Sequence, residues 1–371
     1  MKKLLQILII FFLFNNAYTQ ITTIGNTFSP DTLNVTVGDT VTFTLGATHN
    51  AVGVSQNAWM ANNYSQLVIG GINIGTGLTG YYIPTVAQTY YYVCQAHVAM
   101  GMKGIIIASS ATVPQTYVPD DNFEGALITM GYDNILDDYV STASIDTVTY
   151  LDVSSDNISD LTGIEDFIAL ESLNCSYNQL TSLTLSSVAP MTGYLLCTAN
   201  QLTSLDVSNY PDLNHLNVEQ NLLTALDVSS NTALTNLNCY YNQLDSLDVS
   251  SNTALTNLHC GYNQLTSLDV SSNTALTNLN CYSNLLTSLD VSANTALTSL
   301  YCSNNLLTHL NMRNGVTDAL TTFNATNNDS LECIETLDPD YATENWTYEN
   351  GNIDEGVTFS VDCLFPPVVS I

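Results

Sequence analysis

The 371-residue sequence predicts an all-β protein of two modules: a Greek-key β-sandwich, then a β-solenoid of short repeats with a small helical N-terminal cap. Three observations lead to this prediction. Residues 21–109 alternate apolar and polar side chains in the manner of half-buried strands. From Val148 the chain repeats with a period of 21 residues. Nearly all acidic residues lie in the second part, which indicates a break between two different modules.

The first 19 residues have the pattern of a secretory signal peptide. Lys2 and Lys3 precede an apolar run, and Ala17 supplies a small residue near the cleavage point. The run is shorter than the roughly 20 apolar residues that cross a bilayer, and no later segment is long enough. We therefore expect an exported protein of the periplasm, cell surface or extracellular medium, and not an integral membrane protein.

Charge divides the chain and excludes some partners. The formal net charge is -30, and outside the signal Lys103 and Arg313 are the only basic side chains. Such a surface repels nucleic acid and anionic membranes, so we expect neither as a partner. Residues 21–112 hold only Asp31, Asp39 and Lys103 as charged groups, so the first module is nearly neutral.

The strands of the first module are readable one by one. Residues Leu33–Leu45 alternate with period two around a Gly38-Asp39 turn. Two further strands, Tyr90–Val93 and Lys103–Ile107, flank a short loop. Glycine and asparagine clusters between these runs mark turns. The pattern predicts a small Greek-key sandwich over residues 21–109.

The short loop carries a metal-ligand pattern. Cys94, His97 and Met102 lie on it, and His49 lies 45 residues upstream of the cysteine. One thiolate, two imidazoles and one thioether are the ligands of a blue-copper electron-transfer site. Taken singly, each residue is better explained as a buried thiol or an ordinary polar side chain. Their combination and spacing favour copper over that explanation.

On these residues the first module resembles cupredoxins of the plastocyanin/pseudoazurin type, over residues 26–108. Two signatures of that family are present: His49-Asn50 and Cys94-x2-His97-x4-Met102-x-Gly104. The resemblance implies one type 1 copper ion held by His49, Cys94, His97 and Met102. It also implies that Asn50 ties the two ligand loops together. The ring of His97 would lie near the surface as the electron port.

Two alternatives concern the site itself. Met100 also follows His97, but its spacing is two residues shorter than the family pattern, so Met102 is preferred as axial ligand. Zinc is the alternative metal, although Zn²⁺ prefers a closed tetrahedron without a thioether.

Residues 110–147 read as a linker and an N-terminal cap, with a helix over Val118–Met130. Residues 148–312 then resemble the bacterial 21-residue type of leucine-rich repeat, in eight turns. One inward position of each turn holds cysteine or valine: Val153, Cys175, Cys197, Val218, Cys239, Cys260, Cys281 and Cys302. An asparagine three residues after this position, from Asn178 to Asn305, is expected to bond the main chain of neighbouring turns.

The six cysteines of the repeats admit three interpretations. Side chains of parallel neighbours point the same way, which opposes a disulfide between them. We therefore expect buried free thiols that act as small apolar residues, rather than a metal array or oxidised pairs. Residues 313–371 lose the period and are predicted to form a C-terminal cap closed by a disulfide between Cys333 and Cys363.

An acidic column also recurs along the repeats: Asp206, Asp227, Asp248, Asp269 and Asp290. The simpler interpretation is a solvated face, and the functional one is cation binding, above all Ca²⁺. A second column, which includes Asn217, Asn238 and His259, is neutral and mixed. It resembles a contact surface, although nothing in it names a ligand. His259 and His309 are expected to be surface residues rather than metal ligands.

The sequence holds no catalytic constellation and no second copper cluster, so we expect an electron carrier rather than an enzyme. The expected function is one-electron transfer through copper, with an unknown redox protein as partner. The repeat rod would position the carrier by binding a protein or a glycan. The alternative is a surface adhesion or recognition protein whose cupredoxin only binds or stores copper.

Overall fold

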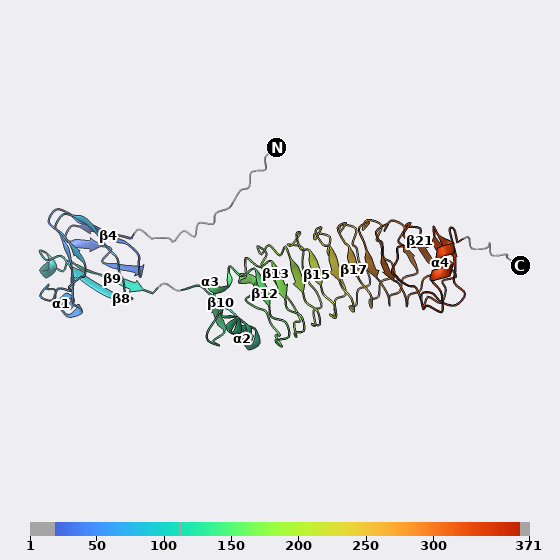
Figure 1. Cartoon of the computed structure of the whole chain (residues 1–371). Coiled ribbons are helices and arrows are strands. Elements are labelled where there is room, and N and C mark those ends of the chain that lie inside the picture. The colour runs from blue at the N-terminus through green and yellow to red at the C-terminus, as the bar shows by residue number, and fades with distance from the viewer. Residues whose placement is uncertain (1–18, 111–112, 364–371) are drawn as a thin grey trace, which may run out of the picture. The chain divides into compact units, whose positions relative to one another are not determined.

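The computed structural model describes residues 19–110 and 113–363. Apart from Thr19, the predicted signal peptide lies outside these residues. The chain divides into two compact units between Val113 and Pro114, and each unit is described by itself (Figure 1). Within the described part of the chain, no helix combines the length and apolar character needed to cross a membrane.

The N-terminal unit is a sandwich of two β-sheets. Its elements are β1 (Thr19–Ile24), β2 (Thr27–Ser29), β3 (Thr32–Thr36), β4 (Val41–Thr44), β5 (Ala51–Val54), α1 (Gln56–Met60), β6 (Asn73–Ile74), β7 (Thr79–Tyr82), β8 (Gln88–Val93), the 3-10 turn η1 (Val98–Met100) and β9 (Lys103–Ser109). One sheet has the order β2-β1-β4-β7 and the other the order β3-β9-β8-β5-β6. The pairs β1–β4 and β3–β9 are parallel, and the other pairs are antiparallel.

Alternation along the strands builds the core of the sandwich. Leu33 and Val35 of β3 are buried while their neighbours in the strand are more exposed, as the period-two pattern predicts. The rings of Phe43 and Tyr92 meet edge to face inside, at 5.3 Å between centroids. Cys94 and Met102 belong to the same apolar cluster as these residues. The metal-ligand loop is therefore anchored directly in the apolar core of the unit.

The second unit begins with a small cap. Strands β10 (Gln115–Tyr117) and β11 (Tyr139–Ser141) pair antiparallel, and helices α2 (Asp121–Met130) and α3 (Thr142–Ile145) follow each of them in turn. The predicted helix starts at Asp121 rather than Val118, because Asp120 is extended and accepts hydrogen bonds at the helix start from the backbone of Asn122 and Phe123. Gly131, with a φ of 83°, ends the helix.

The repeats stack into one parallel sheet of nine strands. These strands are β12 (Tyr150–Asp152), β13 (Ser172–Asn174), β14 (Tyr194–Leu196), β15 (His215–Asn217), β16 (Asn236–Asn238), β17 (Asn257–His259), β18 (Asn278–Asn280), β20 (Ser299–Tyr301) and β22 (Thr322–Asn324). The central residue of each strand is buried and pairs with its equivalent in the next turn, as Leu237 does with Leu258. The 3-10 turn η2 (Ile164–Asp166) precedes the second strand. The β-sandwich, solenoid and small helices together confirm the predicted fold class.

The asparagine column satisfies the backbone where the chain bends. The side-chain nitrogen of Asn263 donates to the carbonyl oxygens of Cys239 and Cys260, at 3.0 and 3.2 Å. Its side-chain oxygen accepts from the N–H of Leu244 at 3.0 Å. Each asparagine of the column repeats this pattern, so the prediction that these amides bond neighbouring turns is confirmed.

Parallel pairing continues beyond residue 312, where the repeat range was predicted to end. Strand β22 extends the main sheet, and a second parallel sheet has the order β19-β21-β23-β24. That sheet consists of β19 (Ser288–Asp290), β21 (His309–Met312), β23 (Cys333–Thr336) and β24 (Thr358–Ser360), and α4 (Pro339–Asn345) lies between its last two strands in sequence. The end of the rod is thus built from further turns whose sequence no longer repeats.

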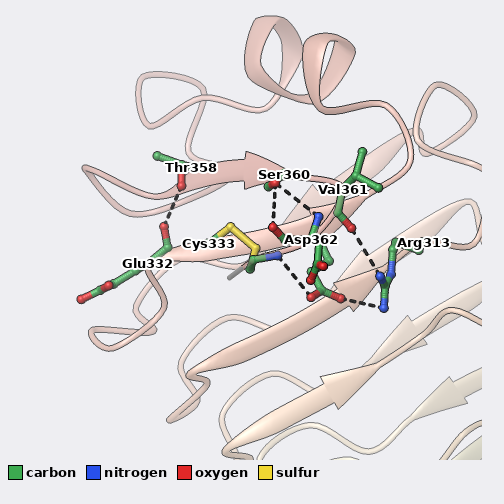
Figure 2. Close-up of a disulfide and its surroundings, with 9 residues drawn as sticks. Arg313, Glu332, Cys333, Thr358, Ser360, Val361 and Asp362 are labelled. Atoms are coloured by element: carbon green, nitrogen blue, oxygen red, sulfur yellow. Dashed lines mark hydrogen bonds and ion pairs between the residues drawn. A yellow bond between two sulfur atoms is a disulfide. The ribbon is translucent and has the colours of Figure 1, made fainter. Parts of the chain in front are cut away.

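A disulfide and an ion pair hold this end together (Figure 2). Cys333 and Cys363 are bonded, with 5.9 Å between their Cα atoms, in the pairing predicted for the cap. The guanidinium of Arg313 lies 3.0 Å from the carboxylate of Glu335. It also donates to the carbonyl oxygen of Val361 at 3.4 Å, so the last strand is tied back to the repeats.

Candidate metal centre

One loop of the sandwich brings His49 to the site. The residue lies between β4 and β5 and is 8% exposed. Its backbone N–H donates to the carbonyl oxygen of Gly46, and its carbonyl oxygen accepts from Gly77. A Cβ atom on Gly46 would lie 3.2 Å from the ring of His49, so the absence of a side chain there leaves room for the imidazole.

A second loop supplies Cys94, His97 and Met102 between β8 and β9. The N–H of Cys94 donates to the carbonyl oxygen of Met102, and the N–H of His97 donates to the carbonyl oxygen of Cys94. The N–H of Met102 in turn donates to His97. These hydrogen bonds connect the backbones of the three residues within one short loop. The direction in which each side chain projects from that loop is therefore fixed.

Three donor atoms converge from the two loops. The Sγ of Cys94 lies 3.3 Å from the Nδ1 of His97 and 3.9 Å from the Nδ1 of His49. The two Nδ1 atoms are 3.1 Å apart. Three ligands in a plane, at bond lengths of about 2.0–2.3 Å, stand roughly 3.5–3.8 Å from one another. The observed separations scatter about that range, so the group fits a single metal ion. Within the described residues, this is the one such group of histidine, cysteine or carboxylate side chains.

The two methionines of the loop differ sharply in burial. Met102 is 0% exposed and packs in the same cluster as Cys94, whereas Met100 is 64% exposed. A thioether that faces solvent is poorly placed to complete a buried site. Burial therefore favours Met102 over Met100 as the axial ligand, which stays a prediction.

Asn50 joins the two loops. Its side-chain nitrogen donates to the Oε1 of Gln95 at 2.7 Å, and its side-chain oxygen accepts from the backbone N–H of Gln95 at 2.9 Å. This is the bridge that the resemblance implied for Asn50. The role of Gln95 was not predicted, because only its position between Cys94 and His97 marks it in the sequence.

A second set of contacts that supports the loop was also not predicted from the sequence. Trp59 donates from its indole nitrogen to the carbonyl oxygen of Gly104, and the ammonium of Lys103 lies 4.1 Å from the centre of the indole ring. A Cβ on Gly104 would overlap the Tyr92 hydroxyl and the carbonyl oxygen of Asp31. The glycine that follows Met102 is thus required by close packing.

The repeat cysteines lie apart from this chemistry. All six are buried free thiols. Burial raises the pKa of Cys239 and of Cys281 to about 12, so both remain protonated at neutral pH. A metal ion would have to displace these protons, which disfavours a metal array and supports the interpretation as small apolar side chains.

The acidic column has a role inside its own turns. The side-chain oxygen of each aspartate accepts a hydrogen bond from the N–H of the serine two residues later: the five are Asp206, Asp227, Asp248, Asp269 and Asp290. Hydrogen bonds from Ser229 lower the pKa of Asp227, and the equivalent serines do the same for Asp206, Asp248 and Asp269. At Asp290 burial alone would raise the pKa, but hydrogen bonds from Ser292 and Asn311 outweigh it and lower the pKa. The local bonds account for these aspartates without a cation, and the calcium hypothesis stays a prediction.

Comparison with known proteins agrees with the geometry of the first unit. Residues 17–109 match the family model for copper binding proteins of the plastocyanin/azurin family. Among solved structures, a purple cupredoxin from Nitrosopumilus maritimus is 22% identical, with a TM-score of 0.20 over 24% of this chain and 100% of the other.

The second unit is similar to internalins of Listeria monocytogenes. Internalin J is 42% identical over 70 residues, which are 19% of this chain and 8% of that protein. A solved functional domain of InlJ, which includes a cysteine ladder, is 34% identical, with a TM-score of 0.48 over 61% of this chain and 58% of the other. The chain thus spans only a small part of the full-length relative. It joins a cupredoxin-like unit, which matches the plastocyanin/azurin family model over residues 17–109, to a repeat unit that is similar to an internalin.

Proposed function

We propose that this protein is an exported one-electron carrier in which a single type 1 copper ion is held by His49, Cys94, His97 and Met102. The observation that carries the proposal is the convergence of one thiol sulfur and two imidazole nitrogens within a 4.8 Å group. Copper bound there would supply a Cu(I)/Cu(II) couple, since thiolate and thioether suit Cu(I) and imidazole suits both states.

The chain's own contribution is rigidity. The two ligand loops are closed by backbone hydrogen bonds and locked together by Asn50 and Gln95. Cys94 and Met102 are fully buried against the sandwich core. A site that cannot relax toward the geometry preferred by either oxidation state needs little reorganisation on electron transfer. This rigidity favours a carrier over a store, which has no need to keep its geometry fixed.

His97 is the proposed point of electron entry and exit. It is partly exposed and caps the turn η1, while the other ring, His49, is buried. The two rings lie 4.7 Å apart between centroids. A redox protein that docks over His97 would come closer to the metal there than over any other ligand of the set.

We propose no catalytic role, because the described residues hold a single group of metal-binding type. The internalin-like unit is proposed to hold the carrier in place outside the cell by binding a protein or a glycan. The purely adhesive alternative, in which copper is only bound or stored, has no observation of its own in its favour.

The test uses the full chain loaded with Cu(II). We expect intense blue absorption from the cysteine-to-copper bond, a type 1 signal in electron paramagnetic resonance and a reversible redox couple. Cys94→Ser should abolish the absorption, and Met100→Ala, at the exposed position, should preserve it. A colourless copper complex, or a blue one in Cys94→Ser, contradicts the proposal. A blue site that cannot be reduced reversibly would contradict electron transfer and would support copper storage alone.

A further inference from the structure

The nine-stranded sheet of the repeat unit carries a group of polar side chains that the proposed copper site does not use. In the middle turns, strands β15 to β17 line a hollow of about 320 Å³. Its polar lining consists of imidazole and amide groups: His215, Asn217, Asn236, Asn238, Asn257 and His259. One carboxylate lies next to this lining, since Asn238 donates to Glu219 at 2.9 Å. Desolvation lowers the pKa of both His215 and His259, and the nearby carboxylate of Glu219 opposes this shift at His259.

Four tyrosines lie two or three residues beyond the ends of strands β16, β17 and β18. Tyr240 follows Asn238 in the chain, and its N–H donates to the side-chain oxygen of that asparagine at 3.1 Å. The rings of Tyr240, Tyr241, Tyr262 and Tyr282 contact one another, with centroids 4.8–6.3 Å apart. Tyr241 and Tyr262 are 55% and 42% exposed. We call these four residues the tyrosine platform.

Gly261 permits the platform to form. Gly261 directly follows a repeat cysteine. In the turn before and the turn after, the same position holds Tyr240 and Tyr282. A Cβ on Gly261 would lie 2.9 Å from the carbonyl oxygen of Tyr282 and 3.0 Å from its ring. Without that Cβ, the hydroxyls of Tyr240 and Tyr282 meet across the intervening turn in a short hydrogen bond. The platform is therefore held in one arrangement before any ligand arrives.

The amides of the hollow are also fixed in advance. Asn257 donates to the side-chain oxygen of Asn236 at 2.7 Å, and Asn278 donates to that of Asn257 at 2.6 Å. Each of the three also donates to the hydroxyl of the threonine before it. The side-chain nitrogens of Asn257 and Asn278 thus each donate twice within the sheet, while an amide oxygen that accepts one bond keeps a second lone pair. The face presents a row of oriented acceptors at the spacing of the strands, about 4.8 Å.

From these features we infer that the hollow and the tyrosine platform together bind a neutral polysaccharide. Exposed aromatic rings suit the apolar faces of sugar rings, and oriented amide acceptors suit their hydroxyl donors. A face that repeats every turn suits a ligand that itself repeats. The negative charge of the protein also restricts the class of polysaccharide, because a chain of net charge -30 repels sulfated or carboxylated polymers. A protein ligand is less well matched, since Leu237 is the one apolar residue among the lining residues of the hollow and offers little to an apolar hot-spot side chain.

This inference rests on the anchoring role proposed for the repeat unit and is independent of the copper couple. The test measures binding of the full copper-loaded chain to soluble hexasaccharides by calorimetry. The probes are β-1,4-linked and β-1,3-linked glucose, α-1,4-linked glucose, β-1,4-linked mannose and β-1,4-linked N-acetylglucosamine, with alginate and heparin as polyanions. We expect at least one neutral probe to bind and neither polyanion to do so.

The variants are Tyr262→Ala and Gly261→Ala, with Tyr177→Ala as the matched control. Tyr177 holds the same place after its cysteine as Tyr262 and is 61% exposed, but it lies outside the platform. Both platform variants should lower the affinity at least about tenfold, and Tyr177→Ala should leave it unchanged. Circular dichroism and the blue absorption of each variant show whether the repeat unit and the copper site are intact.

Three results overturn the inference: no neutral probe binds, a polyanion binds as well as the neutral probes, or folded Tyr262→Ala binds as the native chain does. If the chain binds a surface glycoprotein equally well before and after the glycans of that glycoprotein are removed enzymatically, the ligand is a protein and the inference is wrong. None of these results bears on the copper proposal. Equally, a colourless protein that still binds a neutral glycan contradicts only the copper proposal.

Discussion

The side chain of Asn50 and the backbone of Gln95 share a 2.9 Å hydrogen bond that joins the two ligand loops of the metal centre. The same asparagine donates to the Gln95 side chain at 2.7 Å, so the pair is linked twice. One loop carries His49 and the other carries Cys94 and His97. The relative position of the two histidine nitrogens therefore depends on a contact that neither histidine makes.

Asn50→Ala should weaken the copper site without unfolding the sandwich. The change removes both bonds between the loops but no ligand and no core residue. Loss of such a supporting contact typically costs about 10- to 100-fold in metal affinity, and we expect a loss in that range. Competition with a copper chelator measures it. Asn57→Ala, on the exposed side of α1, is the control and should bind copper as the native chain does. Equal affinities in both variants would show that the bridge is irrelevant to the site.

Met102→Leu should preserve the fold and alter the couple. Leucine fills the buried volume at a modest cost in stability but offers no thioether to the metal. Because Cu(II) loses a donor, we expect the midpoint potential to rise, as measured by spectroelectrochemistry. Met100→Leu, at the 64% exposed position, should leave the potential where it is. The reverse outcome would make Met100 the axial ligand.

The sequence alone was enough to predict features that are local or periodic. The convergence of His49, Cys94 and His97 was predictable because two of them lie within four residues of each other and their types are those of a metal site. The 21-residue period placed the cysteines and asparagines because each turn must bury the same positions. Features that arise between turns were not predicted. The tyrosine platform depends on contacts between residues one or two turns apart, and on Gly261 between them.

The end of the repeats was also hidden from the sequence, for a physical reason. Parallel pairing needs only backbone groups and a small inward side chain, and Ala325 provides one in the position of the earlier cysteines. Asn328 then repeats the amide role, since it donates to the carbonyl oxygens of Cys302 and Ala325. Because Ala325 follows Cys302 by 23 residues rather than 21, the period is broken while the structure continues.

Asn263→Ala tests the asparagine column. The change leaves the N–H of Leu244 without a partner. The carbonyl oxygens of Cys239 and Cys260 lose the bond from Asn263 but keep those from Asn242 and Asn284. An unpaired buried backbone group is costly, and we expect a loss of about 1–3 kcal/mol in the free energy of unfolding of the repeat unit. Urea denaturation followed by circular dichroism measures it. Thr253→Ala, at an exposed position of a neighbouring turn, should change it by less than about 0.5 kcal/mol. Similar losses in the two variants would refute the role of the column.

Asp120 should make the N-terminal end of the repeats sensitive to acid. Burial alone would raise the pKa of this carboxyl, but hydrogen bonds from Ser159, Phe123 and Asp160 outweigh it and lower the pKa below its usual value of 3.8. A carboxyl with a lowered pKa stabilises the fold above the unfolded-state pKa, and the contribution is lost as pH falls through the folded-state pKa. The bond from the backbone of Ser159 is 2.8 Å long and joins the cap helix to the first turn.

Asp120→Asn isolates this contribution from that of the other carboxylates. The variant keeps an acceptor oxygen at the helix start but cannot carry charge, so its melting temperature should lie below the native one at neutral pH. The difference between the two melting temperatures should hold down to about pH 4 and then shrink as Asp120 of the native chain takes up its proton. Thermal melts of both proteins at matched ionic strength, from about pH 7 to about pH 2, measure the difference directly. The other aspartates titrate equally in both proteins and cancel. A difference that stays constant over the whole range would mean that the charge of Asp120 contributes nothing to the stability of the cap.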